Sequence, residues 1–473
     1  MKLPTLALMI CVTHAFLNGC GAARPAKQPP DKQQLAIDLF EDLGGAVAKV
    51  KDSKTERQTI SLSMRFTQVT NGELKELSNI SNLTALDLGS TEVTDAGMND
   101  IARLTNLQSL DLGDTPLTNA GLKKLNGLSN LVSLNLGLTA VTDAGMKELA
   151  KLDRLSLLDL TGTEITDNGL RVLAGLKSLR ELSLNGTRIT DAGLRTVADF
   201  TQLESLGLAR TPVSDQGLKE LIPLNKLSKL ELDQTEVTNA GLQELAHFKN
   251  SLTAISLGDI EVTDAGLREL TKLTRLESLV LVNSQITDAG LKTLTKLENL
   301  SELNLAGTGI TDIGLREFAL FPNLSQLDLS STEITDRGLP ALIQVSNLSR
   351  LDLTNTQITD QGLSVLAKSQ SLRMLRLGLT QISDSGLIDI ARLVDLTSLD
   401  LSETKITDRG LIDLLQLRHL SVLDLHGTEI TNAGVIELAK MERLTWLRLT
   451  QTQITDNVVF ELEKVLPKCQ IVR

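Results

Sequence analysis

Hydrophobic and polar positions recur along this chain with a regular period of about 24 residues, which is typical of a protein built from stacked repeats. The segment TEVTDAG at 91–97 returns, with small changes, in evenly spaced copies that start at Thr91, Thr115, Thr139, Thr163, Thr187, Thr211 and Thr235. The next step, which leads to Ile260, is one residue longer, and the original spacing then continues from Ser284 to Thr452. A weaker copy starts at Thr67.

Each repeat predicts a strand followed by a short helix. In the unit at 131–154, Leu134 and Leu136 alternate with the polar Asn135, as in a half-buried strand. The spacing of three between Met146 and Leu149 continues to the next leucine and fits a short helix or a helical turn. A unit of this size buries its apolar side chains only by stacking on its neighbours.

The pair Thr142-Asp143, just ahead of the helical part, predicts an N-cap, because a short side-chain oxygen can accept from the free N–H groups of the first turn. Every copy holds Asp or Asn at this step. We therefore interpret these carboxylates as helix caps rather than as a chemical site.

The repeat LxxLxLxxTxITDxGLxxLxxLxx resembles the leucine-rich repeat family. It is similar to the cysteine-containing subfamily of F-box proteins, and more closely to bacterial repeat proteins that carry Thr where others carry Asn or Cys. The resemblance covers residues 59–473. It implies an α/β fold, a curved leucine-rich repeat solenoid with a parallel sheet on the concave face, short helices on the convex face, and a cap at each end.

The N-terminus predicts an export signal. Lys2 precedes an apolar run that ends in Leu17-Asn18-Gly19-Cys20. This ending resembles the lipobox of bacterial lipoproteins, in which the cysteine, here Cys20, is lipidated. The alternatives are an ordinary signal peptide or a chance sequence on a cytoplasmic protein. The resemblance implies an exported, lipid-anchored protein of the cell envelope, on the periplasmic or cell-surface side.

Five regions follow from these patterns: a lipoprotein signal peptide at 1–20, a Pro-rich tether at 21–32, an N-terminal cap at 33–62, leucine-rich repeats at 59–456 and a C-terminal cap at 457–473. In the first cap, Leu35, Leu39 and Leu43 have helical spacing, with Ile37 and Phe40 beside them. Strands are expected at 46–50 and 58–62, which leaves little room for an F-box. The second cap predicts a helix that Pro467 stops and one last strand, with Cys469 as a buried thiol.

Composition limits the partners. The chain has 59 acidic and 47 basic residues, a net charge of −12, which argues against nucleic acid and against a basic membrane-binding patch. Membrane contact is expected through the lipid anchor only.

His247, His419 and His426 are isolated, and no nucleophile or metal motif is present. We predict no catalytic residue, no metal and no cofactor.

An acidic ladder is expected on the concave face, where the central position of many strands is aspartate. Its members are Asp87, Asp111, Asp159, Asp328, Asp352, Asp400 and Asp424. Carboxylates on neighbouring strands lie about 4.8 Å apart and repel one another. The ladder is interpreted either as a solubilising face or as a track for a basic partner or Ca²⁺.

A second candidate site lies near the C-terminal end of the concave face. Its residues are Met374 with Arg376, Val422 with His426, and Trp446 with Arg448. Trp and Arg are enriched at interface hot spots. The alternative is that Trp446 packs on the C-terminal cap.

These features favour a non-enzymatic module that binds a protein or peptide on its concave face. One alternative is a structural envelope protein that associates with itself or with wall polymers. Another is an adaptor of ubiquitin-ligase type, which the repeat subtype alone suggests. The ligand and the oligomeric state stay open.

Overall fold

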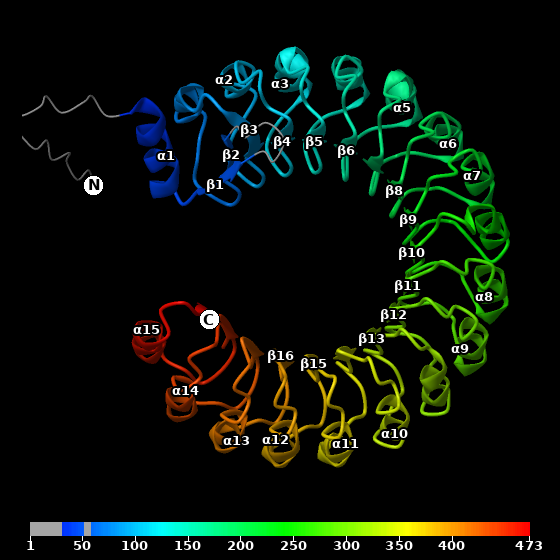
Figure 1. Ribbon diagram of the computed structural model, residues 1–473, viewed down its shortest axis with the longest axis vertical. Helices are drawn as coiled ribbons and strands as arrows, with labels where there is room; N and C mark the ends of the chain where they lie inside the picture. The colour runs from blue at the N-terminus through cyan, green and yellow to red at the C-terminus, as the bar shows by residue number, and fades with distance from the viewer. Residues whose placement is uncertain (1–30, 52–57) are drawn as a thin grey trace, which may run out of the picture.

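A computed structural model describes residues 31–51 and 58–473. The repeats form a curved solenoid that bends into an open ring, with strands lining the inside and helices on the outside (Figure 1). The signal at 1–20 with Cys20, and most of the expected tether, lie outside the described residues. No helix in the described ranges has the length and apolar character needed to cross a membrane.

The described residues form a sheet of 19 strands. These are β1 (Ala46–Lys51), β2 (Gln58–Ser63), β3 (Leu83–Asp87), β4 (Ser109–Asp111), β5 (Ser133–Asn135), β6 (Leu157–Asp159), β7 (Glu181–Ser183), β8 (Ser205–Gly207), β9 (Lys229–Glu231), β10 (Ala254–Ser256), β11 (Ser278–Val280), β12 (Glu302–Asn304), β13 (Gln326–Asp328), β14 (Arg350–Asp352), β15 (Met374–Arg376), β16 (Ser398–Asp400), β17 (Val422–Asp424), β18 (Trp446–Arg448) and β19 (Gln470–Val472).

From β2 onward, short helices return the chain from one strand to the next. The α-helices are α1 (Lys32–Asp42), α2 (Met98–Ile101), α3 (Asn119–Leu122), α4 (Met146–Leu149), α5 (Asp167–Val172), α6 (Asp191–Val197), α7 (Asp215–Glu220), α8 (Asp264–Leu270), α9 (Asp288–Leu294), α10 (Leu339–Leu342), α11 (Asp360–Leu366), α12 (Asp384–Ile390), α13 (Asp408–Leu414), α14 (Asn432–Leu438) and α15 (Asp456–Val465). The 3-10 helices are η1 (Leu74–Asn79), η2 (Lys123–Gly127), η3 (Asp143–Gly145), η4 (Leu173–Gly175), η5 (Gly241–Phe248) and η6 (Gly314–Leu320).

Strand pairing follows the repeat. From β2 onward each strand pairs in parallel with the next one along the chain, while β1 pairs antiparallel with β2. Leu110 lies beside Leu134, one repeat later. The longer step before Ile260 does not break the sheet, since Leu230 still lies beside Ile255. The extra residue therefore sits in the connection after η5.

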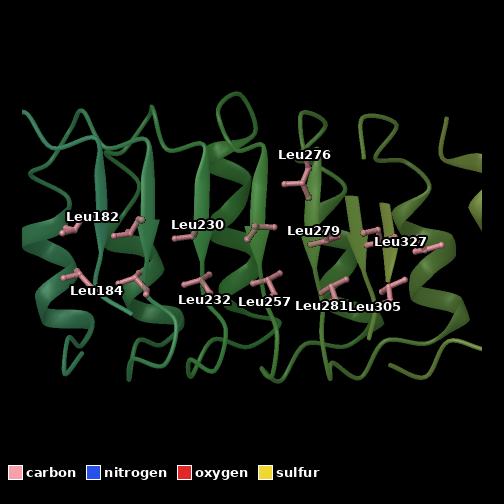
Figure 2. Close-up of a cluster of buried hydrophobic side chains, with 14 of the residues drawn as sticks. Leu182, Leu184, Leu230, Leu232, Leu257, Leu276, Leu279, Leu281, Leu305 and Leu327 are labelled. Atoms are coloured by element: carbon pink, nitrogen blue, oxygen red, sulfur yellow. The ribbon is translucent and has the colours of Figure 1, made fainter. Parts of the chain in front are cut away.

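Leucines fill the space between the sheet and the helices along the whole solenoid. The middle residue of each short strand points into the core between the sheet and the helices, as Leu182, Leu230 and Leu279 do in Figure 2. Each such side chain is almost fully buried, and burying one contributes roughly 1.5–3 kcal/mol. The predicted α/β solenoid of parallel strands and short helices is therefore confirmed.

The threonine that opens each repeat closes a turn. Thr139 is buried, and its Oγ1 donates to the carbonyl of Leu136 at 2.6 Å. The preceding residue, Leu138, has a φ of 58°, a left-handed conformation that L residues rarely adopt. Ile260, which replaces the threonine after the longer step, has no hydroxyl to make this bond.

The Asp or Asn of the Thr-Asp step links neighbouring repeats, which corrects its expected role as a cap. Thr166 caps α5, because its side chain accepts from the N–H of Asn168. Asp143 of the preceding repeat accepts from the backbone N–H of Thr166 at 2.8 Å and from its hydroxyl at 2.6 Å. A carboxylate with two oxygens can hold both groups at once, and sequence spacing alone did not show that it faces the next repeat.

The same link explains the glycine that most repeats carry two residues after this Asp or Asn. A Cβ on Gly169 would lie 2.2 Å from Oδ1 of Asp143. No side chain larger than hydrogen fits there without displacing the carboxylate that joins the two repeats.

The N-terminal cap consists of α1 and the β1–β2 pair. Helix α1 begins earlier than predicted, because the side chain of Asp31 accepts from the N–H of Gln33 at 3.0 Å. The predicted apolar face was correct only in part. Ile37 and Phe40 are buried together with Ala36, and Leu43 packs partly buried against the core, whereas Leu35 is exposed.

At the other end, α15 and β19 form the predicted C-terminal cap elements. Cys469 is a buried free cysteine, and burial raises the pKa of its thiol.

Candidate functional site

The concave surface consists of two parallel rows of side chains. The middle residue of each three-residue strand is buried, so the first and third residues face the inside of the ring. We call the first residues row A, from Ser109 in β4 to Trp446 in β18. We call the third residues row B, from Asp111 in β4 to Arg448 in β18. In β3, Ala85 and Asp87 hold the equivalent places.

Row B is not a continuous acidic ladder. From β3 to β18 it reads Asp87, Asp111, Asn135, Asp159, Ser183, Gly207, Glu231, Ser256, Val280, Asn304, Asp328, Asp352, Arg376, Asp400, Asp424 and Arg448. The predicted aspartates thus form one group at each end of the arc, and the middle is largely neutral. In the C-terminal group, an arginine follows each pair of aspartates.

One carboxylate oxygen of every predicted ladder aspartate closes the turn after its strand. Oδ1 accepts the backbone N–H two residues later at 2.8–2.9 Å. The donors are the N–H groups of Gly89, Gly113, Thr161, Ser330, Thr354, Ser402 and His426. Since Oδ1 is used in this turn, Oδ2 is the oxygen left to meet neighbouring side chains or a ligand.

Arginines neutralise much of this acidic charge. Arg376 lies 3.2 Å from Oδ2 of Asp352, and Arg448 lies 3.4 Å from Oδ2 of Asp424. Two residues predicted as partner contacts are therefore also ion-pair partners of the ladder.

Arg65 has the same role at the N-terminal end, and the sequence analysis missed it. Its guanidinium bonds to Asp87 at 3.0 Å and also to Asp111. Burial opposes its charge, but the hydrogen bonds and charges of these carboxylates hold the pKa of Arg65 above its ordinary value. Arg65 lies 24 residues before Gly89, at a repeat position where no other repeat carries an arginine, so the period did not mark it.

The apolar candidates gather in row A. Met374, Val422 and Trp446 are all half-buried and lie on β15, β17 and β18. Val422 is directly beside Trp446, and Ser398 separates Met374 from Val422. The structure therefore brings these three residues onto one row, next to Arg376 and the Asp–Arg pairs of row B.

His426 is less available than predicted. It follows β17, with Nδ1 at 2.6 Å from the hydroxyl of Thr450 and Nε2 at 3.3 Å from Glu403. Its side chain is 17% exposed. Both ring nitrogens have protein partners, so neither is free to bond to a ligand.

A shallow hollow of about 230 Å³ adjoins this area on β12 to β15. Met374 and Arg376 line one side of it, and Glu302, Gln326 and Arg350 extend it along row A. Arg350 donates to Gln326 at 3.1 Å. These last three residues were not predicted, although their places in row A follow from the repeat.

In the ranges 31–51 and 58–473, no three His, Cys, Asp or Glu side chains are grouped so that they could hold a metal ion. The side chains of rows A and B offer hydrogen bonds, ion pairs and apolar contact.

Sequence comparison identifies the repeats. A family model described as a leucine-rich repeat region matches residues 158–390. A second model, leucine rich repeat, matches 79–102, 103–125, 127–150, 394–415 and 416–439. The chain belongs to the leucine-rich repeat family. No curated protein matches it in sequence.

Several solved leucine-rich repeat structures are similar. An internalin from Listeria monocytogenes is 27% identical over 68% of this chain and 82% of its own, with a TM-score of 0.42. The leucine-rich repeat protein LIC12759 of Leptospira interrogans is 23% identical over 78% of this chain and 96% of its own, with a TM-score of 0.49. The TLR13 chain of a TLR13–ssRNA13 complex is 19% identical over 84% of this chain and 67% of its own, with a TM-score of 0.51. The last of these shows a shared fold.

Proposed function

We propose that this leucine-rich repeat protein is a non-enzymatic module that binds a protein or peptide on the C-terminal part of its concave face. Leucine-rich repeat solenoids present extended concave surfaces that commonly mediate protein binding. The proposed site consists of Met374, Val422 and Trp446 in row A and of Arg376 and Arg448 in row B.

The observation that carries this proposal is the change in row A along the arc. From β3 to β14 row A holds one large apolar side chain, Leu157 in β6, and its other members are small, polar or charged. At β15, β17 and β18 it holds large apolar side chains that are half-buried by the protein alone. A tryptophan and arginines in one patch are the residue types that contribute most at protein interfaces.

The patch also defines the chemistry of the ligand. Apolar side chains of the ligand would contact row A, and its charged groups would meet the alternating Asp and Arg of row B. Both signs of charge are present within one strand spacing of each other, so a peptide with mixed charge fits better than a polyanion. The net charge of −12 further supports a protein ligand over nucleic acid.

We propose in addition that the module is held at the cell envelope by lipid on Cys20. The support is the Leu17-Asn18-Gly19-Cys20 sequence after an apolar run. Metabolic labelling with a fatty acid tests this part alone. Labelling is expected for the native chain and lost in Cys20→Ala, and labelling that persists in the variant would exclude this anchor.

The binding proposal is tested with a chain that starts after Cys20, immobilised and exposed to envelope extract. The test variant is Arg376→Ala, Trp446→Ala, Arg448→Ala. The matched control is Arg171→Ala, Arg195→Ala, Lys219→Ala, which removes exposed basic residues from convex helices α5 to α7. Circular dichroism verifies that both variants are folded.

A specific protein retained by the native chain and the convex control, but lost from the concave variant, is the expected result. Equal retention by all three would place the site elsewhere on the solenoid. Retention of further copies of this chain alone would favour the structural role.

A further inference from the structure

The turns that follow the strands carry a third row of side chains, along one edge of the sheet. Its members are the residues directly before the repeat threonine or its replacement, and we call them row C. They all have a positive φ, a conformation that glycine adopts freely and that asparagine and aspartate tolerate better than bulky residues. In chain order they are Phe66, Ser90, Asp114, Leu138, Gly162, Gly186, Arg210, Gln234, Asp259, Asn283, Gly307, Ser331, Asn355, Leu379, Glu403, Gly427 and Gln451.

Phe66 and Leu138 stand out in row C because they are large, apolar and exposed. Their exposed fractions are 75% and 63%, and their φ angles are 62° and 58°. Leu138 leans over Gly162, since a Cβ on that glycine would lie 2.6 Å from Cδ2 of Leu138. Glycine or asparagine would adopt these two turns at lower cost, so packing within the solenoid does not account for Phe66 and Leu138.

One hollow of about 460 Å³ joins these two residues. Pro116 is a third apolar residue that lines it, and Glu92 and Asp114 are its charged residues. These three belong to the two repeats between Phe66 and Leu138. The hollow therefore has an apolar side chain at each end and carboxylates in between.

The distance between the two ends follows from the backbone. The N–H groups of Phe66, Ser90 and Asp114 donate to a carbonyl of the next repeat at 3.2, 2.9 and 2.8 Å. Row C thus continues the strand ladder, in which neighbouring strands lie about 4.8 Å apart. Three such steps place Phe66 and Leu138 roughly 14 Å apart.

The carboxylates of this hollow are available to a ligand. Glu92 and Asp114 are exposed, and neither has an ion pair or a side-chain hydrogen bond within residues 31–51 and 58–473. The described residues that line the hollow include no lysine, arginine or histidine. The end of α1, which lies beside the turn of Phe66, adds Glu41 and Asp42.

The cations around this edge are already engaged. The guanidinium of Arg65 lies 5.8 Å from the centre of the Phe66 ring, but it bonds to Asp87 and Asp111 in row B. On the helix side of the turns, Lys124 donates to the carbonyl of Asp95 at 3.0 Å. A cation from a partner would therefore complement this hollow.

An extended peptide matches both the charge and the spacing. In an extended segment the side chains i, i+2 and i+4 face the same side, and i and i+4 lie about 13 Å apart. Apolar side chains at i and i+4 would contact Phe66 and Leu138, and a basic side chain at i+2 would meet Glu92 and Asp114. An α-helix needs about nine residues to span the same distance, and a small cation would leave the two apolar side chains without a contact.

We propose that the hollow between Phe66 and Leu138 binds an extended segment of a partner protein, with apolar residues at i and i+4 and lysine or arginine at i+2. This edge site lies near the opposite end of the arc from Met374, Val422 and Trp446 (Figure 1). The protein thus has two binding surfaces, one on the concave face and one on the edge of the first repeats.

The test measures fluorescence anisotropy of the labelled peptide Ser-Leu-Ser-Arg-Ser-Leu-Ser, with blocked ends, against the full chain. A second peptide carries glutamate in place of arginine. A third, Ser-Ser-Leu-Arg-Leu-Ser-Ser, has the composition of the first but places its leucines too close together and on the opposite side from the arginine.

Two double variants of the chain probe the two parts of the site. Phe66→Asn/Leu138→Asn removes the apolar ends and introduces the residue that Asn283 and Asn355 already supply in row C. Glu92→Gln/Asp114→Asn removes the charge. Leu379→Asn is the matched control, because it makes the same change in row C far from the hollow.

The first peptide is expected to bind equally to the native chain and to Leu379→Asn. We expect binding at least about tenfold weaker for either double variant, and for the second and third peptides on the native chain. The melting temperature of Phe66→Asn/Leu138→Asn should not fall, because asparagine tolerates a positive φ. Binding should persist in Arg376→Ala, Trp446→Ala, Arg448→Ala, which separates the edge site from the concave one.

Three results would overturn the proposal. The first is that the arginine peptide does not bind, or binds both double variants as well as the native chain. The second is equal binding of the third peptide, which identifies simple attraction between charges. The third is a dimer in analytical ultracentrifugation that Phe66→Asn/Leu138→Asn abolishes, which identifies a second copy of this chain as the occupant.

Discussion

The Asp-to-Thr link between repeats predicts a measurable local loss of stability when one aspartate is removed. Asp167 accepts from the backbone N–H of Thr190 at 2.9 Å and from its hydroxyl at 2.7 Å. In Asp167→Ala both acceptors disappear, and the part-buried N–H of Thr190 loses its partner. Asp167→Asn is the matched control, because an asparagine already makes this link elsewhere. Asn119 Oδ1 accepts from the backbone N–H of Thr142 at 3.0 Å, and Asn119 Nδ2 donates to the Thr142 hydroxyl at 2.9 Å.

The magnitude follows from the two bonds. Hydrogen bonds to a charged group contribute about 1.5–3 kcal/mol each when both partners are removed from water. Because this link is part-buried, we expect about 2–3 kcal/mol for Asp167→Ala and less than about 1 kcal/mol for Asp167→Asn. Since each 1.4 kcal/mol is a factor of ten, local opening at Thr190 should become about 30- to 150-fold more frequent in the alanine variant.

Amide hydrogen exchange at Thr190 is the appropriate assay, because it reports this link directly. Global unfolding of a long solenoid need not be two-state. The exchange rate should rise in Asp167→Ala and stay within a few-fold of native in Asp167→Asn. An unchanged rate in the alanine variant would show that the link does not hold the two repeats together.

Three further predictions concern the turn, the concave face and the cap. Thr308→Val removes the bond from Thr308 Oγ1 to the carbonyl of Leu305 at 2.6 Å and should lower the free energy of local opening at this turn, measured by amide hydrogen exchange, by about 1 kcal/mol; no loss would contradict a stabilising role. Burial opposes ionisation of Glu231, but hydrogen bonds from Lys229 and Asn185 and the charge of Lys229 hold its pKa below the ordinary value. Its stabilisation is therefore present above about pH 4.3 and lost as the pH falls through the folded pKa, so Glu231→Gln should flatten the acid limb of stability against pH, and an unchanged limb would refute this. Cys469 is buried with a raised thiol pKa, so peptide mapping should find it alkylated slowly until the chain unfolds, and fast native labelling would contradict its burial.

The repeat architecture could be predicted because its determinants recur. A residue such as Leu134 has the same neighbours in every copy, and a single period fixes strand, helix and curvature together. Ile260 and the longer step before it could be located in the sequence, but only the pairing of Leu230 with Ile255 shows that the sheet continues through them.

What the sequence did not provide were contacts between repeats and at the ends. Aspartate is common at helix N-caps, so the sequence suggested that role for Asp143. Its partner in the structure, Thr166, becomes evident only when two repeats are stacked. Arg65 occupies the repeat position of Gly89, where no other repeat carries an arginine, so the period gave no signal for its bonds to Asp87 and Asp111. In α1 the sequence offers two apolar faces. The structure buries the face with Phe40 and leaves Leu35 exposed.

The candidate site was predicted only in part. Trp446 and Met374 stood out as large apolar residues at strand positions that are mostly small, polar or charged. Their assembly with Val422 on one row depends on the register of β15 to β18. His426 stood out equally, yet its contacts with Thr450 and Glu403 depend on two neighbouring turns.

Site-specific photo-crosslinking tests most directly whether the C-terminal concave face binds the ligand. A photoreactive phenylalanine analogue is placed at Met374 or Trp446 on the concave face, and at Arg171 or Lys219 on the convex face as matched controls. The chain is then irradiated in envelope extract, and adducts are identified by mass spectrometry. We expect one protein crosslinked from both concave positions and from neither convex position. The same adducts from the convex positions, with none from Met374 or Trp446, would contradict concave binding.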